Sequence, residues 1–141
     1  GFHPADKRQY GVLDTDGDRV KRIVEWKYWK ALPTNEQKRM DICNSGIYAA
    51  RIRDLLPYLA VLRSIPHVVS KEREGKMVPV KEYFITDLVE LLDRDGKSVG
   101  CILAEDEDEV MGVDDLSALQ RAQERFRKLH NPSCRPSPSF R

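Results

Sequence analysis

The segment from Lys81 to Leu92 constrains the fold most strongly, because a polar approach leads directly into an amphipathic helix. Leu88, Leu91 and Leu92 stand at positions i, i+3 and i+4, so they line one helical face. The pattern predicts a helix over residues 82–94, and an Asp-Gly pair ends it. We expect the rest of the chain to be organised around this helix.

Two interpretations fit the start of this predicted helix. Thr86 and Asp87 stand where unpaired backbone N–H groups and the positive end of the helix dipole gather. Together with the ring of Phe84, they would grip a sugar or a phosphate. The alternative is an ordinary helix start, in which Thr86 or Asp87 caps the helix and Phe84 lies in the core.

Charge and cysteine content bound the partners of this 141-residue chain. Its 24 basic and 23 acidic residues give a net charge of +1, which argues against a nucleic-acid partner. No apolar run approaches the roughly 18 residues that cross a bilayer, and no signal peptide is visible. The three cysteines are too widely spaced for a recognisable zinc site, and their odd number argues against a disulfide framework. These features predict a cytoplasmic protein that binds neither nucleic acid nor membrane.

The first half of the chain predicts a β-hairpin followed by mixed elements. Residues 10–13 and 20–27 are predicted as strands, because an Asp-Gly pair between them favours a tight turn. The next predicted elements are a short helix from Pro33 to about Met40, a strand over 41–50 interrupted by Asn44-Ser45-Gly46, and a helix over 52–62 that Pro57 divides or kinks.

The second half adds the helix already described and a final helix. Its other predicted elements are a surface loop or excursion from the sheet over 64–80, a buried strand over 99–103, an acidic solvated loop over 105–109 and a helix from Asp114-Asp115 to about Lys128. Residues 131–141 are rich in Pro and Ser and are predicted to be a disordered tail. Strands that alternate with helices indicate an α/β fold, in one domain over residues 1–130.

Five motifs, in this order, resemble one enzyme family. They are Tyr10-Gly11, Ile23-Val24-Glu25-Trp26-Lys27, Asn44-Ser45-Gly46-Ile47-Tyr48, Glu82-Tyr83-Phe84-Ile85-Thr86-Asp87 and Glu109-Val110-Met111-Gly112-Val113-Asp114-Asp115. Over residues 10–127 they are similar to the later part of the uridylyltransferase domain of bacterial bifunctional N-acetylglucosamine-1-phosphate uridylyltransferase/glucosamine-1-phosphate acetyltransferases. The last two motifs are the specific ones, since the others recur across sugar nucleotidyltransferases.

The resemblance implies a fold and a reaction. The fold is a Rossmann-like nucleotide-diphospho-sugar transferase domain with a mixed sheet and flanking helices, of which this chain would be the acceptor-sugar side. The reaction joins UTP and N-acetylglucosamine 1-phosphate into UDP-N-acetylglucosamine and pyrophosphate with Mg²⁺, and its product is a peptidoglycan precursor. A homo-oligomer is expected for the full-length enzyme.

The resemblance also implies roles for particular residues. Gly11 would present its backbone to the sugar, and Glu25 would accept hydrogen bonds from sugar hydroxyls. Asn44 would offer both a donor and an acceptor. Thr86 would add a hydroxyl, and Phe84 supplies a ring where relatives often carry Tyr. We expect Gly11, Glu25 and Asn44 to face one cleft across neighbouring strands.

Asp114 stands where the family has an Asn that binds metal and nucleotide sugar, and its carboxylate also suits Mg²⁺. Structural roles remain open beside these functional ones. Glu25 would then be a strand-surface charge, Asn44 a turn residue and Asp114 only a helix cap.

The chain also departs from the family pattern. It contains no Gly-rich nucleotide loop, no activating Lys beside such a loop, no Gly-Asp metal motif and no hexapeptide repeats of the acetyltransferase half. Val12 replaces the usual Arg, and Tyr28 stands where an acidic residue is common. We therefore expect this chain alone to be inactive and assign it no catalytic residue. The alternative function is a noncatalytic sugar-nucleotide-binding or interaction module derived from the enzyme.

Overall fold

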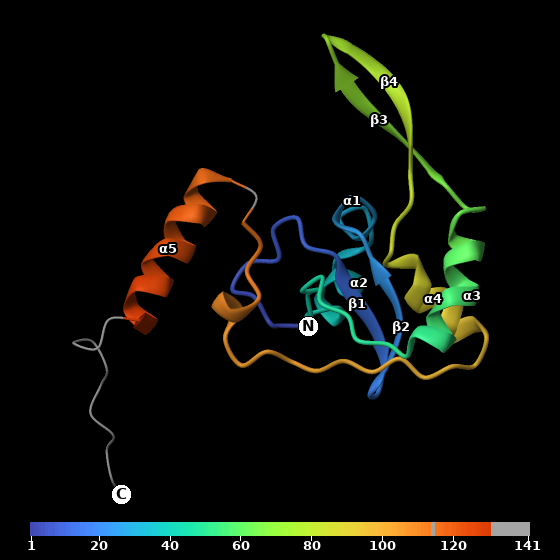
Figure 1. Cartoon of the computed structure of the whole chain (residues 1–141), viewed down its shortest axis with the longest axis horizontal. Coiled ribbons are helices and arrows are strands. Elements are labelled where there is room, and N and C mark those ends of the chain that lie inside the picture. The colour runs from blue at the N-terminus through green and yellow to red at the C-terminus, as the bar shows by residue number, and fades with distance from the viewer. Residues whose placement is uncertain (114, 131–141) are drawn as a thin grey trace, which may run out of the picture.

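The computed structural model describes residues 1–113 and 115–130. Asp114 and the predicted tail at 131–141 lie outside the described residues. The elements follow one another as shown in Figure 1: β1 (Val12–Asp16), β2 (Arg19–Val24), α1 (Trp26–Trp29), α2 (Thr34–Arg39), α3 (Ile52–Leu62), β3 (His67–Arg73), β4 (Lys76–Glu82), α4 (Asp87–Arg94), the short 3₁₀ helix η1 (Glu107–Glu109) and α5 (Leu116–His130).

The first predicted hairpin is confirmed, although both strands differ from their expected bounds. β1 and β2 pair antiparallel, with Val12 opposite Val24. Gly17 lies in the turn at φ +57°, a left-handed conformation that glycine adopts without a side-chain clash. The strand expected over 20–27 ends early, because Trp26 begins α1.

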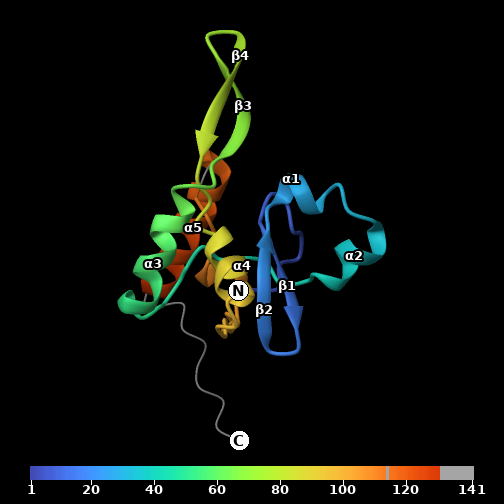
Figure 2. The same ribbon diagram turned by 90° about the vertical axis from the view of Figure 1, so that its right-hand side faces the viewer.

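The segment predicted as a surface loop or an excursion from the sheet is a second hairpin. β3 and β4 pair from His67 opposite Glu82 to Arg73 opposite Lys76, and Gly75 turns the chain at φ +75°. Figures 1 and 2 show this hairpin extending away from the rest of the molecule. Most side chains of both strands are exposed, so charged residues that suggested a loop are compatible with a strand here.

Helix α4 contributes to two of the three apolar clusters in the described part of the chain. It begins at Asp87 and not at residue 82, because the chain up to Glu82 belongs to β4. Its predicted leucine face is confirmed, since Leu88 and Leu91 are buried against α3. Val89 is buried with residues of the first hairpin. One helix of eight residues therefore joins two apolar clusters.

The strand predicted over 41–50 is wrong. Only Cys43 forms β-bridges, to Phe2 and Val12, and its neighbours Ile42 and Asn44 add one backbone hydrogen bond each. The chain then turns at Asn44-Ser45-Gly46, because Gly46 takes a positive φ of 74° that ends extended pairing.

The buried strand predicted over 99–103 is also wrong. These residues form no strand, and Ile102 is 91% exposed, although Val99 and Cys101 are half-buried against the cluster that contains Val89. Val99 makes a single backbone contact with the first hairpin, accepting a hydrogen bond from the Val20 N–H at 2.8 Å. A short apolar run forms a strand only where another strand pairs with it, and the run alone does not show whether such a partner exists.

The predicted helices over 33–40 and 52–62 are confirmed as α2 and α3. The expected division at Pro57 is wrong, because α3 runs as one helix of 11 residues with Pro57 inside it.

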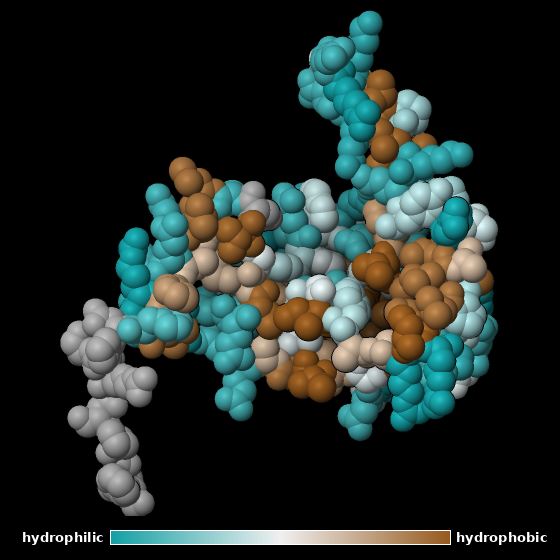
Figure 3. All heavy atoms as spheres, viewed as in Figure 1, coloured by the Kyte–Doolittle hydropathy of each residue, from teal (hydrophilic) through white to brown (hydrophobic). Residues whose placement is uncertain are grey.

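Helix α5 ends within two residues of its expected end, but little of it is buried. Asp115 caps its start, since its Oδ1 accepts a hydrogen bond from the Ala118 N–H at 2.6 Å. Arg125 pairs with Asp106 and Asp108 beside η1, which lies in the predicted acidic loop. Its apolar residues Leu116, Leu119 and Phe126 are exposed, and Figure 3 shows apolar residues gathered over α5. None of the helices in the described part of the chain is long and apolar enough to cross a membrane.

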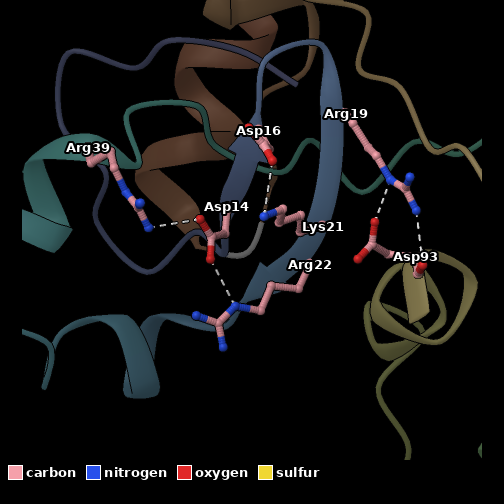
Figure 4. A network of polar contacts seen from close by, with 7 residues as sticks. All are labelled: Asp14, Asp16, Arg19, Lys21, Arg22, Arg39 and Asp93. Carbon is pink, nitrogen blue, oxygen red and sulfur yellow. Dashed lines mark hydrogen bonds and ion pairs between the residues drawn. The ribbon is translucent and has the colours of Figure 1, made fainter. Parts of the chain in front are cut away.

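Ion pairs connect the first hairpin with helices α2 and α4 (Figure 4). Asp14 is 8% exposed and accepts hydrogen bonds from Arg22 of β2 at 3.0 Å and from Arg39 of α2 at 3.1 Å. Arg19 binds both the carboxylate and the backbone carbonyl of Asp93 in α4. A buried carboxylate held by two guanidinium groups meets the requirement that a buried charge be paired.

The mixed α and β composition is confirmed. Within residues 1–113 and 115–130 the strands form two separate antiparallel pairs, β1–β2 and β3–β4. The resemblance implies a larger mixed sheet of the Rossmann-like type, which these two pairs alone do not form. The Rossmann-like fold therefore remains part of our proposal.

Candidate functional site

Gly11, Glu25 and Asn44 lie together at the end of the first hairpin that is opposite its turn. Asn44 follows the Cys43 bridge to β1, and its N–H donates to the Gly11 carbonyl at 2.8 Å. A Cβ atom on Gly11 would lie 3.2 Å from Ile23 Cγ2 and 3.6 Å from Glu25 Oε2. Glycine at this position therefore keeps the space beside the Glu25 carboxylate open.

Thr86 joins this group from a distant part of the sequence. Its hydroxyl donates to Glu25 Oε1 at 2.8 Å, across 61 residues of chain. Thr86 is 5% exposed and Glu25 is partly buried, so water competes little for this hydrogen bond. Oε1 is thus engaged by Thr86, whereas Oε2 is the carboxylate oxygen that faces Gly11.

Tyr48 extends the group through Asn44. The Asn44 side-chain oxygen accepts hydrogen bonds from the Tyr48 hydroxyl and the Gly46 N–H, both at 3.1 Å. Burial raises the pKa of Tyr48, the hydrogen bond to Asn44 partly offsets this, and the negative charge of Glu25 adds to the rise. The bond from the Gly46 N–H makes Asn44 a turn residue. The effect of Glu25 on Tyr48, which bonds to Asn44, indicates that the Asn44 carboxamide also lies near the Glu25 carboxylate.

Phe84 is not in the core but at the edge of this group. Its ring stacks on His67, with centroids 4.3 Å apart and ring planes at 20°. Lys27 Nζ lies over the Phe84 ring, 4.8 Å from its centroid. One face of the ring is therefore already covered by an imidazole, which leaves less of it for stacking on a sugar.

The capping interpretation of Thr86 and Asp87 is wrong for both side chains. Thr86 precedes α4 with helical backbone angles, and its side chain makes no capping hydrogen bond. The first N–H groups of the helix instead donate to the nearby carbonyls of Phe84, Ile85 and Thr86. Neither side chain is therefore needed as a cap. Each instead contacts a residue that is distant in the sequence, Thr86 bonding to Glu25 and Asp87 to His67 at 2.6 Å.

The chain aligns with known proteins over most of its length. "Bifunctional protein GlmU" of Azorhizobium caulinodans is 37% identical over 123 residues, which cover 87% of this chain and 24% of that protein. The proteins of the same name from Jannaschia sp. and Sphingopyxis alaskensis are 35% and 34% identical, over 89% and 86% of this chain.

This chain is homologous to part of the bifunctional protein GlmU. The resemblance inferred from the five motifs is therefore confirmed. The chain spans about a quarter of the length of the curated relatives it matches. No protein-family model matches it.

The GlmU resemblance implies Mg²⁺, and the described residues alone show no cluster of metal-binding side chains. Asp114, the expected ligand, lies outside them. Within 1–113 and 115–130, no three His, Cys, Asp or Glu side chains gather into a group that could hold a metal ion. We therefore derive no chemical step through a metal.

Sequence reasoning gave no role to three residues that the structure adds to the site. Lys27 and Tyr48 stand inside the motifs that resemble the family, so the sequence could have nominated them as site residues. His67 offered none, because its contacts depend on a hairpin that the sequence did not reveal.

Proposed function

We propose that this chain forms the acceptor-sugar side of a sugar-1-phosphate nucleotidyltransferase that makes UDP-N-acetylglucosamine from UTP and N-acetylglucosamine 1-phosphate. The observation that carries the proposal is the meeting of Gly11, Glu25, Asn44 and Thr86 from four separate motifs. The Rossmann-like fold, the cytoplasmic location and the homo-oligomer of the full-length enzyme belong to the same proposal.

The polar groups of this site suit a sugar. Each sugar hydroxyl is both a donor and an acceptor, and Glu25 Oε2 would accept hydrogen bonds from hydroxyls beside Gly11. The Asn44 carboxamide nitrogen would donate, since its oxygen is engaged by Tyr48 and Gly46. Thr86 would orient Glu25, because its hydroxyl proton is already committed to that carboxylate.

The described residues would bind and orient the sugar phosphate for attack on the nucleotide. Catalysis of phosphoryl-type transfer depends mainly on such positioning and on charge neutralisation. A bound Mg²⁺ would supply charge neutralisation, and we propose Asp114 as the residue of this chain that reaches the metal and the nucleotide sugar.

Titration of the isotopically labelled chain with N-acetylglucosamine 1-phosphate tests this proposal. Amide signals of Gly11, Glu25 and Asn44 should shift, and Glu25→Gln should weaken affinity about tenfold, as expected when a charge-assisted hydrogen bond becomes a neutral one. Glu90→Gln, an exposed change on α4, is the matched control and should bind as the unmodified chain does. Shifts confined to other residues, or equal affinity in Glu25→Gln, would contradict the assignment.

The exposed apolar face of α5 favours a second candidate, an interaction module derived from the enzyme. Leu116, Phe126 and Leu129 are each at least 60% exposed. An apolar surface of this kind marks an interaction site when it is continuous. The two candidates differ in activity. An assembly that contains this chain should catalyse the reaction under the first candidate and need not do so under the second.

A further inference from the structure

His67 connects the projecting hairpin to the candidate site. It is the first residue of β3, and its imidazole Nε2 donates to Asp87 Oδ2 at 2.6 Å. The same ring stacks on Phe84 and lies 6.5 Å from Tyr28. The side chains of His67 and Asp87 are 30% and 23% exposed, so solvent screens their contact only in part.

The first turn of α4 carries two side-chain contacts in different directions. Thr86 holds the Glu25 carboxylate, and its neighbour Asp87 holds His67. Because backbone carbonyls satisfy the first N–H groups of the helix, neither side chain is needed as a cap. The two contacts share one short backbone segment, so the position of one affects the other.

The β3–β4 hairpin makes few other contacts with the rest of the molecule near His67. β3 and β4 form a sheet of their own, and Figures 1 and 2 show the hairpin standing away from the other elements. His67 lies at its base, where the chain returns to the body of the molecule. The bond to Asp87 and the stack on Phe84 therefore fix both the hairpin and the segment that leads into α4.

We propose that His67 is a positioning residue for the Glu25–Thr86 pair. By holding Asp87 it keeps the first turn of α4 in the orientation from which the Thr86 hydroxyl reaches Glu25 Oε1. This inference rests on the proposed function, since the oriented carboxylate is the group that would bind the sugar.

Three substitutions separate the two contacts of His67. His67→Phe keeps an aromatic ring on Phe84 but removes the donor to Asp87. His67→Gln returns an N–H close to the position of Nε2 but removes the stack. His67→Ala removes both. His3→Ala is the matched control, because His3 lies 3.6 Å from Asp41 in an exposed pair with side chains 53% and 65% accessible.

The free 141-residue chain gives a readout that needs no ligand. In His67→Ala and His67→Phe, the amide signals of Glu25 and Thr86 should shift, whereas His67→Gln and His3→Ala should keep them close to their original positions. Melting temperature and signal dispersion show that each variant is folded. Unmoved Glu25 and Thr86 signals in a folded His67→Ala variant would overturn the proposal, as would His67→Phe behaving as the unmodified chain.

Titration with N-acetylglucosamine 1-phosphate gives the second readout. His67→Ala and His67→Phe should bind about tenfold more weakly, and His67→Gln should recover most of the affinity. If the unmodified chain does not bind while its His67 variants still shift Glu25 and Thr86, the proposed function fails and the positioning role stands. Full affinity in His67→Ala would overturn the positioning role.

Discussion

At the scale of single residues, the hydrogen bond from Thr86 determines which oxygen of the Glu25 carboxylate faces the candidate site. The Thr86 hydroxyl fixes Glu25 Oε1, which leaves Oε2 facing the space beside Gly11. A partly buried carboxylate needs such a partner, because an unpaired charge away from water is strongly disfavoured. In the proposed site Thr86, which is more deeply buried than Glu25, would therefore act on a bound sugar through its neighbour.

This arrangement predicts the effect of removing the hydroxyl. Thr86→Val keeps the shape of the side chain but leaves Glu25 Oε1 without its donor, so it should cost about 1–3 kcal/mol of unfolding free energy. Urea denaturation measures that loss, and titration with N-acetylglucosamine 1-phosphate should show weaker binding. Thr86→Ser retains the hydroxyl and serves as the control, and equal losses in both variants would mean that the methyl group matters and the hydrogen bond does not.

Cys43 gives a pH-dependent prediction. Burial raises the pKa of its thiol from 9.0 to about 11, so the unfolded chain loses this proton at lower pH than the folded chain does. Its contribution to stability is complete below pH 9 and is lost as pH rises towards 11, by about 2–3 kcal/mol in total.

Urea midpoints between pH 8 and pH 11 test this. Cys43→Ala should show a smaller decline than the unmodified chain, and the comparison between the two removes the contribution of Tyr48 and Tyr58, whose pKa values are also raised. Parallel declines in both proteins would show that the Cys43 thiol does not titrate as its burial requires.

At the scale of elements, α4 joins the apolar clusters around it. Leu88 is 4% exposed and packs with α3, whereas Leu116 at the start of α5 is 71% exposed. Leu88→Ala should therefore lower the unfolding free energy by about 2–5 kcal/mol, through lost burial and the cavity that remains. Leu116→Ala, the same change on an exposed face, should alter it by about 0.5 kcal/mol or less. Urea denaturation of the two variants checks both values, and similar losses would mean that α5 is covered in solution.

The contrast between α4 and its neighbours explains what the sequence could predict. The leucine spacing of α4 is a local period, and burial of one face follows from it. The β3–β4 hairpin was missed because few of its side chains are buried, so its valines at 69, 78 and 80 gave only a weak alternating signal beside a charged run. Ile102 shows the opposite error, in which an apolar residue suggested burial and is exposed.

At the scale of the whole molecule, the site is assembled from segments that only the fold brings together. The motifs identified Gly11, Glu25, Asn44 and Thr86 as candidates, but the Thr86–Glu25 bond depends on how α4 packs against β2. The role of His67 depends in addition on the second hairpin. Resemblance can thus nominate residues, whereas contacts between distant segments need the packed structure.

The isolated chain should bind the acceptor sugar phosphate without turning it over. Its 141 residues contain no Gly-rich nucleotide loop, so nothing in the sequence is expected to hold the triphosphate of UTP. Purified chain mixed with UTP, N-acetylglucosamine 1-phosphate and Mg²⁺ should release no pyrophosphate above the protein-free background. Mg²⁺-dependent release that Glu25→Gln abolishes would show that this chain is a complete catalyst.

Asp114 is best tested in a longer enzyme that combines this segment with a nucleotide loop. Asp115 already caps α5, through the Ala118 N–H, so loss of the Asp114 side chain should change stability by about 0.5 kcal/mol or less. If Asp114 binds Mg²⁺, Asp114→Ala should instead reduce turnover by about a hundredfold or more, because metal ligation stabilises transition-state charge by several kcal/mol. Asp114→Asn, which restores the family residue, should retain activity. Turnover at saturating Mg²⁺ and melting temperature separate the roles, and near-normal turnover in both variants would remove Asp114 from the metal site.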